Sequence, residues 1–232
     1  MVNSKNAFWQ ALVVTIFVFV AGLVLGFHIE LSNVDKSDSL IRSSEVDFLD
    51  QQIKFSILNS GINFNCENSK KDIFDFADQV YVDAVKFEEE DAQSKFTEEQ
   101  RGILHKRYDL LRVNLWIESL KLRENCNGSF HTILYFFDYS SPDVDIRSEQ
   151  RIMSLVLLDL KYRYPNDILL LPIAANMDLD SIDMIKENYN VSRSPTLIID
   201  ESLVIDSLIT ADELEKKVFG DEKREKVIIL NS

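Results

Sequence analysis

The sequence predicts an α/β protein with an N-terminal transmembrane helix, a stalk built on a helical hairpin, and a C-terminal domain of alternating strands and helices. Three observations predict it: an uncharged apolar run at the start, helical apolar spacing through the middle, and short apolar strands after residue 130. The expected boundaries are 1–29 for the cytoplasmic tip and anchor, 30–126 for the stalk, 127–220 for the α/β domain and 221–232 for a tail.

The composition indicates a folded domain and argues against a nucleic-acid partner. The 232 residues are 46% apolar, which is enough to bury a core. A formal charge of −14 repels a phosphate backbone, and no stripe of Lys and Arg interleaved with aromatic residues offsets it. The negative charge otherwise fits a soluble protein surface.

The first long apolar run predicts a helix that contacts the lipid bilayer. Residues 8–27 read FWQALVVTIFVFVAGLVLGF, twenty residues without a charge. At a rise of about 1.5 Å per residue this length matches a hydrocarbon core of about 30 Å. A cleaved signal peptide is the alternative, but its apolar region normally has about 7 to 15 residues, and no clear A-x-A site follows this run. We therefore expect a signal-anchor.

The charges beside this run predict its orientation. Lys5 and the free amine precede it, whereas Glu30, Asp35 and Asp38 follow it with only one nearby lysine. The positive side normally stays in the cytoplasm, so we expect the remaining chain outside the cell membrane.

A second feature of the apolar run concerns self-association. Gly22 and Gly26 form a GxxxG pattern that allows two such helices to approach closely, as in a homodimer. Glycine is common in membrane spans for other reasons as well.

Helical spacing predicts the stalk. A first helix should carry Val46, Leu49, Ile53 and Ile57 and end near residues 59–61. A second should start with Ser69 as its cap, and its apolar face should hold Ile73, Phe76, Val80, Ala84 and Phe87.

A third helix should run from a capping box at Thr97 to about Glu124. It has one apolar side with Leu104, Tyr108, Leu111 and Leu115, and another with Ile103, Leu110, Ile117 and Leu120. The short link makes the second helix its antiparallel neighbour. Its other side needs either the first helix or the C-terminal domain.

The antiparallel hairpin brings the two cysteines together. Cys66 lies just before the second helix and Cys126 just after the third, so a disulfide is expected in an oxidising compartment. Its loop of about sixty residues would contribute ~4 kcal/mol through chain entropy. Two unrelated buried thiols are the alternative. Asn127 and Asn190 begin triplets that match the N-glycosylation pattern, which also occurs by chance.

From His131 the pattern predicts the order βαβαββα. The expected strands are 131–138, 167–175, 196–200 and 203–208, and the expected helices are 145–164, 180–189 and one starting at Thr210. The first of these helices should face inward with Ile152, Met153, Val156, Leu157 and Leu160.

Residues 131–219 resemble the thioredoxin-like fold at two places. The strand ILYFF runs into a loop and a long helix, where the family places Cys-x-x-Cys, and VSRSPTL before a hairpin looks like its cis-proline segment. The resemblance implies a cis bond between Ser194 and Pro195. Anchor, stalk and terminal domain together are similar to membrane-anchored thioredoxin-like proteins of archaea.

The sequence departs from this family at the redox motif. Ser141, Pro142, Asp143 and Val144 occupy the motif positions, so both thiols are missing. A serine hydroxyl does not ionise enough near neutral pH to replace a thiolate. Dithiol exchange at this place is therefore not expected.

Other chemistry has little support. The three histidines, His28, His105 and His131, are far apart and suggest no metal site or catalytic triad. Acidic triplets around residues 138–145 and 178–183 lack the glycine and distal glutamate of a calcium loop. We predict no metal and no cofactor.

These observations predict a non-catalytic module that binds a protein or peptide. An extended peptide can pair with the backbone beside the cis-proline without any thiol. The expected groove residues are Arg193, Ser194, Pro195 and Thr196, facing residues 139–143. The alternative is a thiol-disulfide oxidoreductase that uses Cys66 or Cys126. A purely architectural role in a membrane complex is a third possibility.

Overall fold

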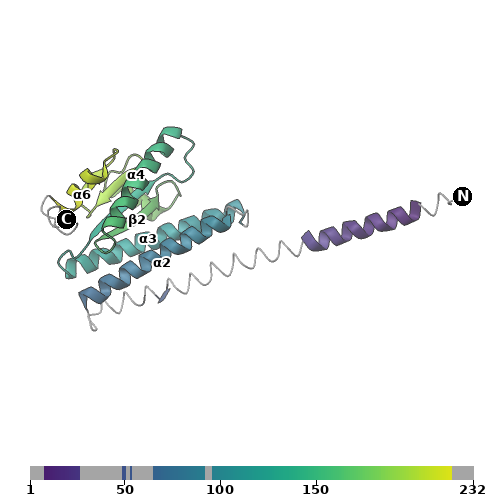
Figure 1. The fold of residues 1–232 in the computed structure, drawn as a ribbon, viewed down its shortest axis with the longest axis horizontal. Coiled ribbons are helices and arrows are strands. Elements are labelled where there is room, and N and C mark those ends of the chain that lie inside the picture. The colour runs from purple at the N-terminus through teal and green to yellow at the C-terminus, as the bar shows by residue number, and fades with distance from the viewer. Residues whose placement is uncertain (1–7, 27–48, 51–52, 54–64, 92–95, 221–232) are drawn as a thin grey trace, which may run out of the picture.

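The computed structural model describes residues 8–26, 49–50, 53, 65–91 and 96–220. Within these ranges it contains, besides an N-terminal apolar helix, the following elements (Figure 1): α2 (Cys66–Asp91), α3 (Glu98–Asn125), β1 (His131–Phe137), α4 (Val144–Arg163), β2 (Ile168–Ala174), α5 (Asp180–Asn188), β3 (Thr196–Ile199), β4 (Leu203–Ile205) and α6 (Ala211–Phe219). After residue 130 this is the order that the sequence predicts.

The N-terminal helix is long and apolar enough to cross a membrane. It spans Phe8–Gly26, has a mean hydropathy of 2.4, and none of it is buried in the protein. No described residue comes within 4 Å of a side chain added at Gly22 or Gly26. The charges that predict orientation, most of the first stalk helix, and the tail lie outside the described residues.

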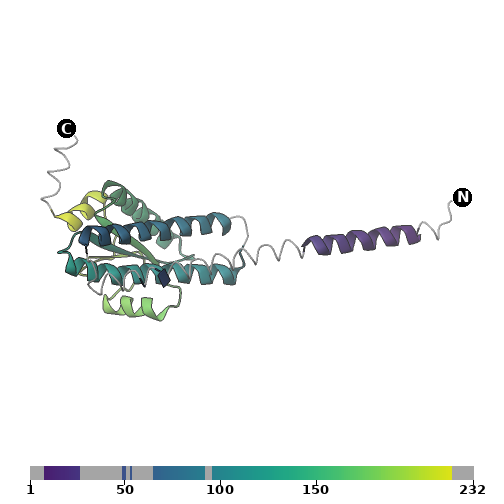
Figure 2. The same ribbon diagram turned by 90° about the horizontal axis from the view of Figure 1, so that it is seen from below.

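The hairpin of α2 and α3 forms as expected, and a disulfide joins its ends. The two helices lie side by side in both views (Figures 1 and 2). Cys66 and Cys126 are bonded, with their Cα atoms 5.7 Å apart.

The start of α2 corrects one prediction. Ser69 lies inside the helix and is buried, and Asn65 caps the helix instead, because its Oδ1 accepts from the backbone N–H groups of Glu67 (2.9 Å) and Asn68 (3.3 Å). The predicted capping box of Thr97 with Gln100 is present.

The sheet has the strand order β2-β1-β3-β4. β1 pairs with β2 in parallel, and the pairs β1 with β3 and β3 with β4 are antiparallel. β1 is therefore central and β2 is an edge strand. The loops that follow β1 and β2 leave the same edge of the sheet, since parallel strands end on the same side.

Helices cover both faces of the sheet (Figure 2), and the sheet separates the apolar core into two clusters. Leu134, Phe136 and Leu169 belong to the cluster with α2, α3 and α5. Ile133, Leu157 and Leu214 belong to the cluster with α4 and α6. The hairpin is thus part of the α/β core rather than a separate stalk.

Two helix faces differ from the prediction. Ile103, Leu110 and Ile117 of α3 are exposed, and α3 meets the sheet instead through a side that includes Val113 and Trp116. In α4, Ile152 is also exposed, whereas Met153, Leu157 and Leu160 point inward as expected. Periodicity identifies apolar faces but does not say which of them finds a partner.

Candidate functional site

The loop after β1 holds the residues at the redox-motif positions. Ser141 is buried, and its carbonyl accepts a hydrogen bond from Arg147 Nη1 at 2.6 Å. Pro142, Asp143 and Val144 are exposed, and α4 begins at Val144. These residues therefore form a loop fastened to the first turns of α4.

The Asp143 side chain caps the N-terminus of α4. Its Oδ1 accepts from the backbone N–H groups of Asp145 (2.8 Å) and Ile146 (3.4 Å). The first N–H groups of a helix attract an anion, and here the chain's own carboxylate occupies that place. In this loop the helix start supports a cap instead of a reactive thiolate.

The proline segment faces the same helix. The Ser194–Pro195 bond is cis, and both residues are buried. Thr196 Oγ1 donates to the Arg193 carbonyl at 2.7 Å, and the Arg193 guanidinium pairs with Glu149 of α4. Residues 193–196 are thereby held beside the first turns of α4.

A cavity of about 460 Å³ lies between these parts, and we call it the proline groove. Ile146 of α4 forms one wall, residues 191–194 form another, and Ala175, Asn176 and Asp178 after β2 lie on a third. Asn176 joins the loop after β2 to the loop after β1. Its side-chain oxygen accepts from the Tyr139 N–H (2.8 Å), and its side-chain nitrogen donates to the Tyr139 carbonyl (3.0 Å).

The proline groove has both charged and backbone groups on its wall. Lys186 Nζ donates to the Ala175 carbonyl (3.0 Å) and pairs with Asp183 (2.9 Å). Ser192 is exposed beside the buried Ser194. Such a wall can hydrogen-bond an extended chain, but it carries no nucleophile comparable to a thiolate.

A second cavity of about 550 Å³ lies toward α2 and α3. Asp138 lines both cavities, whereas Tyr139 and Ser141 line only this one. The His105 ring centroid is 4.0 Å from that of Tyr139. The loop after β1 thus separates two hollows. The sequence predicts Tyr139 and Ser141 as site residues but not His105.

Asp109 on the wall of this second cavity is buried, with 2% of its surface exposed. Its Oδ1 accepts from the Ala174 N–H (3.2 Å) and from Arg112 Nη1 (3.3 Å). Burial raises the pKa of Asp109 to about 6, against the opposing effect of Arg112. Burial also lowers the pKa of Arg112.

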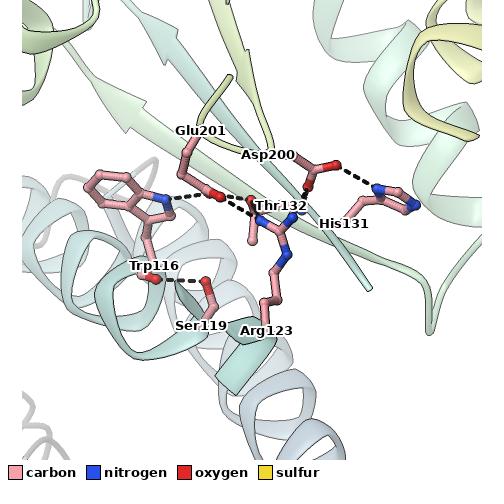
Figure 3. A network of polar contacts seen from close by, with 7 residues as sticks. All are labelled: Trp116, Ser119, Arg123, His131, Thr132, Asp200 and Glu201. Atoms are coloured by element: carbon pink, nitrogen blue, oxygen red, sulfur yellow. Dashed lines mark hydrogen bonds and ion pairs between the residues drawn. The ribbon is translucent and has the colours of Figure 1, made fainter. Parts of the chain in front are cut away.

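A polar network joins α3 to the turn between β3 and β4 at the other end of the sheet (Figure 3). Arg123 pairs with Asp200 at 3.0 Å and with Glu201 at 2.5 Å. Asp200 and Glu201 both have positive φ, 48° and 58°, which non-glycine residues rarely adopt. Arg123 therefore stabilises a turn whose backbone conformation is unfavourable for Asp200 and Glu201 themselves.

Further bonds complete this network. Trp116 Nε1 and Thr132 Oγ1 donate to Glu201 Oε1, at 3.0 and 2.6 Å. His131 Nδ1 lies 2.6 Å from Asp200 Oδ2. Burial would raise the pKa of Asp200, but the hydrogen bonds from His131 and the Thr132 N–H and the charge of Arg123 outweigh it, so this pKa is lowered.

The site residues predicted from sequence thus fall into two places. Arg193 and Ser194 line the proline groove with Ile146, as predicted. Pro195 and Thr196 are buried and do not line it, and from the loop after β1 the groove is lined by Asp138 rather than by residues 139–143. Cys66 and Cys126 precede β1, at its other end. Seven strand residues at about 3.3 Å each separate the two places by ~20 Å.

Comparison with known proteins gives no family. No protein-family model matches the chain. No curated protein matches it either.

Solved structures similar to this chain include three thioredoxins. Thioredoxin O2 from Arabidopsis thaliana has 20% identity over 40% of this chain and 76% of its own, with a TM-score of 0.27. Deadhead from Drosophila melanogaster has 19% identity over 44% of this chain and 88% of its own, with a TM-score of 0.29. Mitochondrial thioredoxin 3 from Saccharomyces cerevisiae has 19% identity over 43% of this chain and 86% of its own, with a TM-score of 0.29. The likeness concerns fold alone.

Proposed function

We propose that this chain is a single-pass membrane protein whose thioredoxin-like domain binds an extended segment of another protein in the proline groove, without redox chemistry. The observation that carries the proposal is the groove itself. It lies between α4 and residues 191–194, where backbone groups and short polar side chains meet one apolar wall at Ile146. Extended peptides bind such places mainly through main-chain hydrogen bonds.

The residues at the motif positions support a role without thiols. Asp143 caps α4, and both cysteines of the chain are joined in the disulfide. For the alternative, a thiol-disulfide oxidoreductase, Cys66 or Cys126 would first have to be released by reduction. A thiolate formed there would act ~20 Å from the proline groove.

We further propose that the domain lies outside the cytoplasm. Lys5 before the apolar helix and the acidic residues after it favour this orientation. A disulfide that closes a long loop is also typical of an oxidising compartment. Protease added to intact cells should then digest the domain, and protection until lysis would contradict the orientation.

Two identical substitutions on α4 test the groove. Ile146→Trp fills the proline groove, whereas Ile152→Trp places the same side chain on an exposed position of the same helix. The full chain in lipid nanodiscs is panned against a displayed library of extended peptides, and selected peptides are measured by titration. We expect Ile146→Trp to weaken binding at least ~tenfold, the factor that about 1.4 kcal/mol gives.

The control should bind as the wild type does. Peptides that bind Ile146→Trp and wild type equally would place the site elsewhere. A library that yields no binder to the wild type would contradict the peptide-binding function itself.

A further inference from the structure

Two Asn-x-Ser triplets, the pattern that accepts an N-linked glycan, lie in different surroundings in this fold. The first is 127–129, Asn-Gly-Ser, between α3 and β1, and the second is 190–192, Asn-Val-Ser, after α5. Both asparagines are exposed and follow the end of a helix with positive φ, 52° for Asn127 and 54° for Asn190. The asparagines alone therefore do not distinguish the two triplets.

The first triplet is exposed at all three residues. No described residue beyond its chain neighbours comes within 4 Å of a Cβ added at Gly128. Within the described part of the chain, neither the Asn127 carboxamide nor the Ser129 hydroxyl has a hydrogen-bond partner. Both groups that define the acceptor pattern are therefore available to an enzyme at the surface.

The residues on either side hold this triplet at the surface. Cys126 belongs to the disulfide, and Phe130 is buried, with 2% of its surface exposed. Between them the Gly128 N–H donates to the Arg123 carbonyl at 2.9 Å. Gly128 has a φ of 68°, a conformation that costs glycine little. The folded chain thus presents residues 127–129 as a short exposed turn between two fixed points.

The second triplet is held by the core and by the proline groove. Val191 is half-buried against the core cluster of α2, α3 and α5, and its N–H donates to the Lys186 carbonyl at 2.8 Å. Ser192 lines the proline groove, and the chain then enters the buried Ser194. Residues 190–192 therefore cannot leave the surface without disturbing the wall of the groove.

We propose that Asn127 carries an N-linked glycan and that Asn190 does not, because an enzyme that meets the folded chain finds only the first triplet free. The proposal rests on the proposed position of the domain outside the cytoplasm, where such glycans are transferred. The donor is a saccharide carried on a lipid phosphate or diphosphate. Its acceptor is a surface turn of the kind in which this modification occurs.

The transfer is a substitution at the anomeric carbon of the saccharide. The Asn127 side-chain nitrogen forms a bond to that carbon, and the bond from the carbon to the phosphate oxygen breaks. The lipid phosphate leaves with the electron pair, and one proton of the amide passes to a base of the transferring enzyme. The step needs no oxidant or reductant.

A glycan at Asn127 leaves the proline groove free. Asn127 precedes β1, whereas the groove lies beyond the other end of this strand, and seven strand residues separate the two by ~20 Å. A glycan is bulky and well hydrated. It therefore covers the surface beside Cys126 and directs protein partners to the end of the domain that holds the groove.

Mass spectrometry of the full chain from its native membranes tests the proposal. Trypsin cuts after lysine and arginine, so after reduction of the disulfide the two triplets lie in separate peptides, 124–147 and 187–193. We expect a saccharide on peptide 124–147 and none on peptide 187–193.

Three variants made in the same cells identify the acceptor. Ser129→Ala removes the hydroxyl of the pattern and should remove the saccharide, whereas Ser129→Thr keeps a hydroxyl and should retain it. Ser192→Ala breaks the second triplet and should leave the saccharide on peptide 124–147. Ser129 and Ser192 are exposed, so these changes do not open the core. An intact Cys66–Cys126 bond checks that each variant has folded.

The outcomes separate this proposal from the orientation on which it rests. A bare peptide 124–147, in a chain whose domain is digested by protease on intact cells, would overturn the glycan and leave the orientation standing. A bare peptide in a chain protected from protease would overturn both. A saccharide on peptide 187–193, or one that persists on peptide 124–147 in Ser129→Ala, would overturn the choice of Asn127 as the acceptor.

Discussion

The two ends of the sheet are built differently. At the end where β1 starts, the Cys66–Cys126 disulfide joins the two ends of the hairpin, and the Arg123 network ties the hairpin to the β3–β4 turn. At the end where β1 stops, the loop after β1 lies between two cavities of about 460 and 550 Å³. We call the end where β1 starts the closed end and the end where β1 stops the open end.

This difference separates the links that stabilise the fold from the proposed binding groove. The disulfide and the Arg123 network lie away from the proline groove, so the groove can bind a partner without these links being disturbed. The cysteines belong to the closed end, and Asp143 occupies the helix start at the open end. Binding surfaces commonly lie on loops positioned by a rigid scaffold.

The largest effect should come from removing the disulfide at the closed end. The two cysteines are 60 residues apart, and limiting the chain entropy of such a loop contributes ~4 kcal/mol. Cys66→Ser with Cys126→Ser should lower the free energy of unfolding in urea by about this amount. A loss below ~1 kcal/mol would mean that the closed end does not depend on the bond.

Arg123→Met should cost ~3 kcal/mol, because two largely buried carboxylates of Asp200 and Glu201 lose their shared cation. Urea unfolding measures the loss. Lys121→Met is the matched control, since its pair with Glu118 is more exposed and should contribute under ~1 kcal/mol. Equal losses of unfolding free energy for both variants would mean that the Arg123 network does not stabilise the closed end.

At the open end, Asp109 should make stability depend on pH. Its pKa is about 6 in the folded chain against an ordinary 3.8, so the folded state binds the proton more tightly. That contribution is fully present below about pH 4 and is lost as pH rises through 6, ~2 kcal/mol between pH 4 and 7. Asp109→Asn removes this dependence.

The measurement is the difference in unfolding free energy between wild type and Asp109→Asn across this pH range. The wild type should lose stability relative to the variant as pH rises. The exposed Asp75→Asn should follow the wild type. A difference that is constant with pH, or that changes in the opposite direction, would contradict the role of Asp109.

The smallest effect should come from the cap of α4. Asp143→Ala leaves two backbone N–H groups without their carboxylate and should cost ~1 kcal/mol, while Asp143→Ser should retain most of the stability. Thermal unfolding followed by circular dichroism measures both. Identical losses would mean that the side chain of Asp143 does not cap the helix.

Local signals in the sequence predict most of the fold. Strand runs such as residues 131–137 and the capping boxes at Thr97 and Thr210 depend on neighbouring residues, so they are visible without a structure. The sequence prediction places the cap of α2 at Ser69, whereas Asn65 caps the helix; both residue types are good caps, so the cap preference alone does not rank them.

The features that the sequence does not predict depend on distant contacts. Asp109 lies on a helix between two apolar faces, and only the packing of α3 on the end of β2 buries it. Arg123 and Glu201 are 78 residues apart, so nothing in either neighbourhood indicates their pairing. The proline groove is predictable in part, since the Ser194–Pro195 segment carries the resemblance, but Ile146 as its wall is not.

The most direct test of the account is to identify what contacts the open end. A photoreactive amino acid replaces Ser192 beside the proline groove, or Glu124 at the closed end as a control, in the full chain in native membranes. Crosslinked products are digested without reduction and analysed by mass spectrometry. We expect a polypeptide attached at position 192 and not at 124, with the Cys66–Cys126 bond intact in the same product. A mixed disulfide between the partner and Cys66 or Cys126, or equal crosslinking at both positions, would contradict the account.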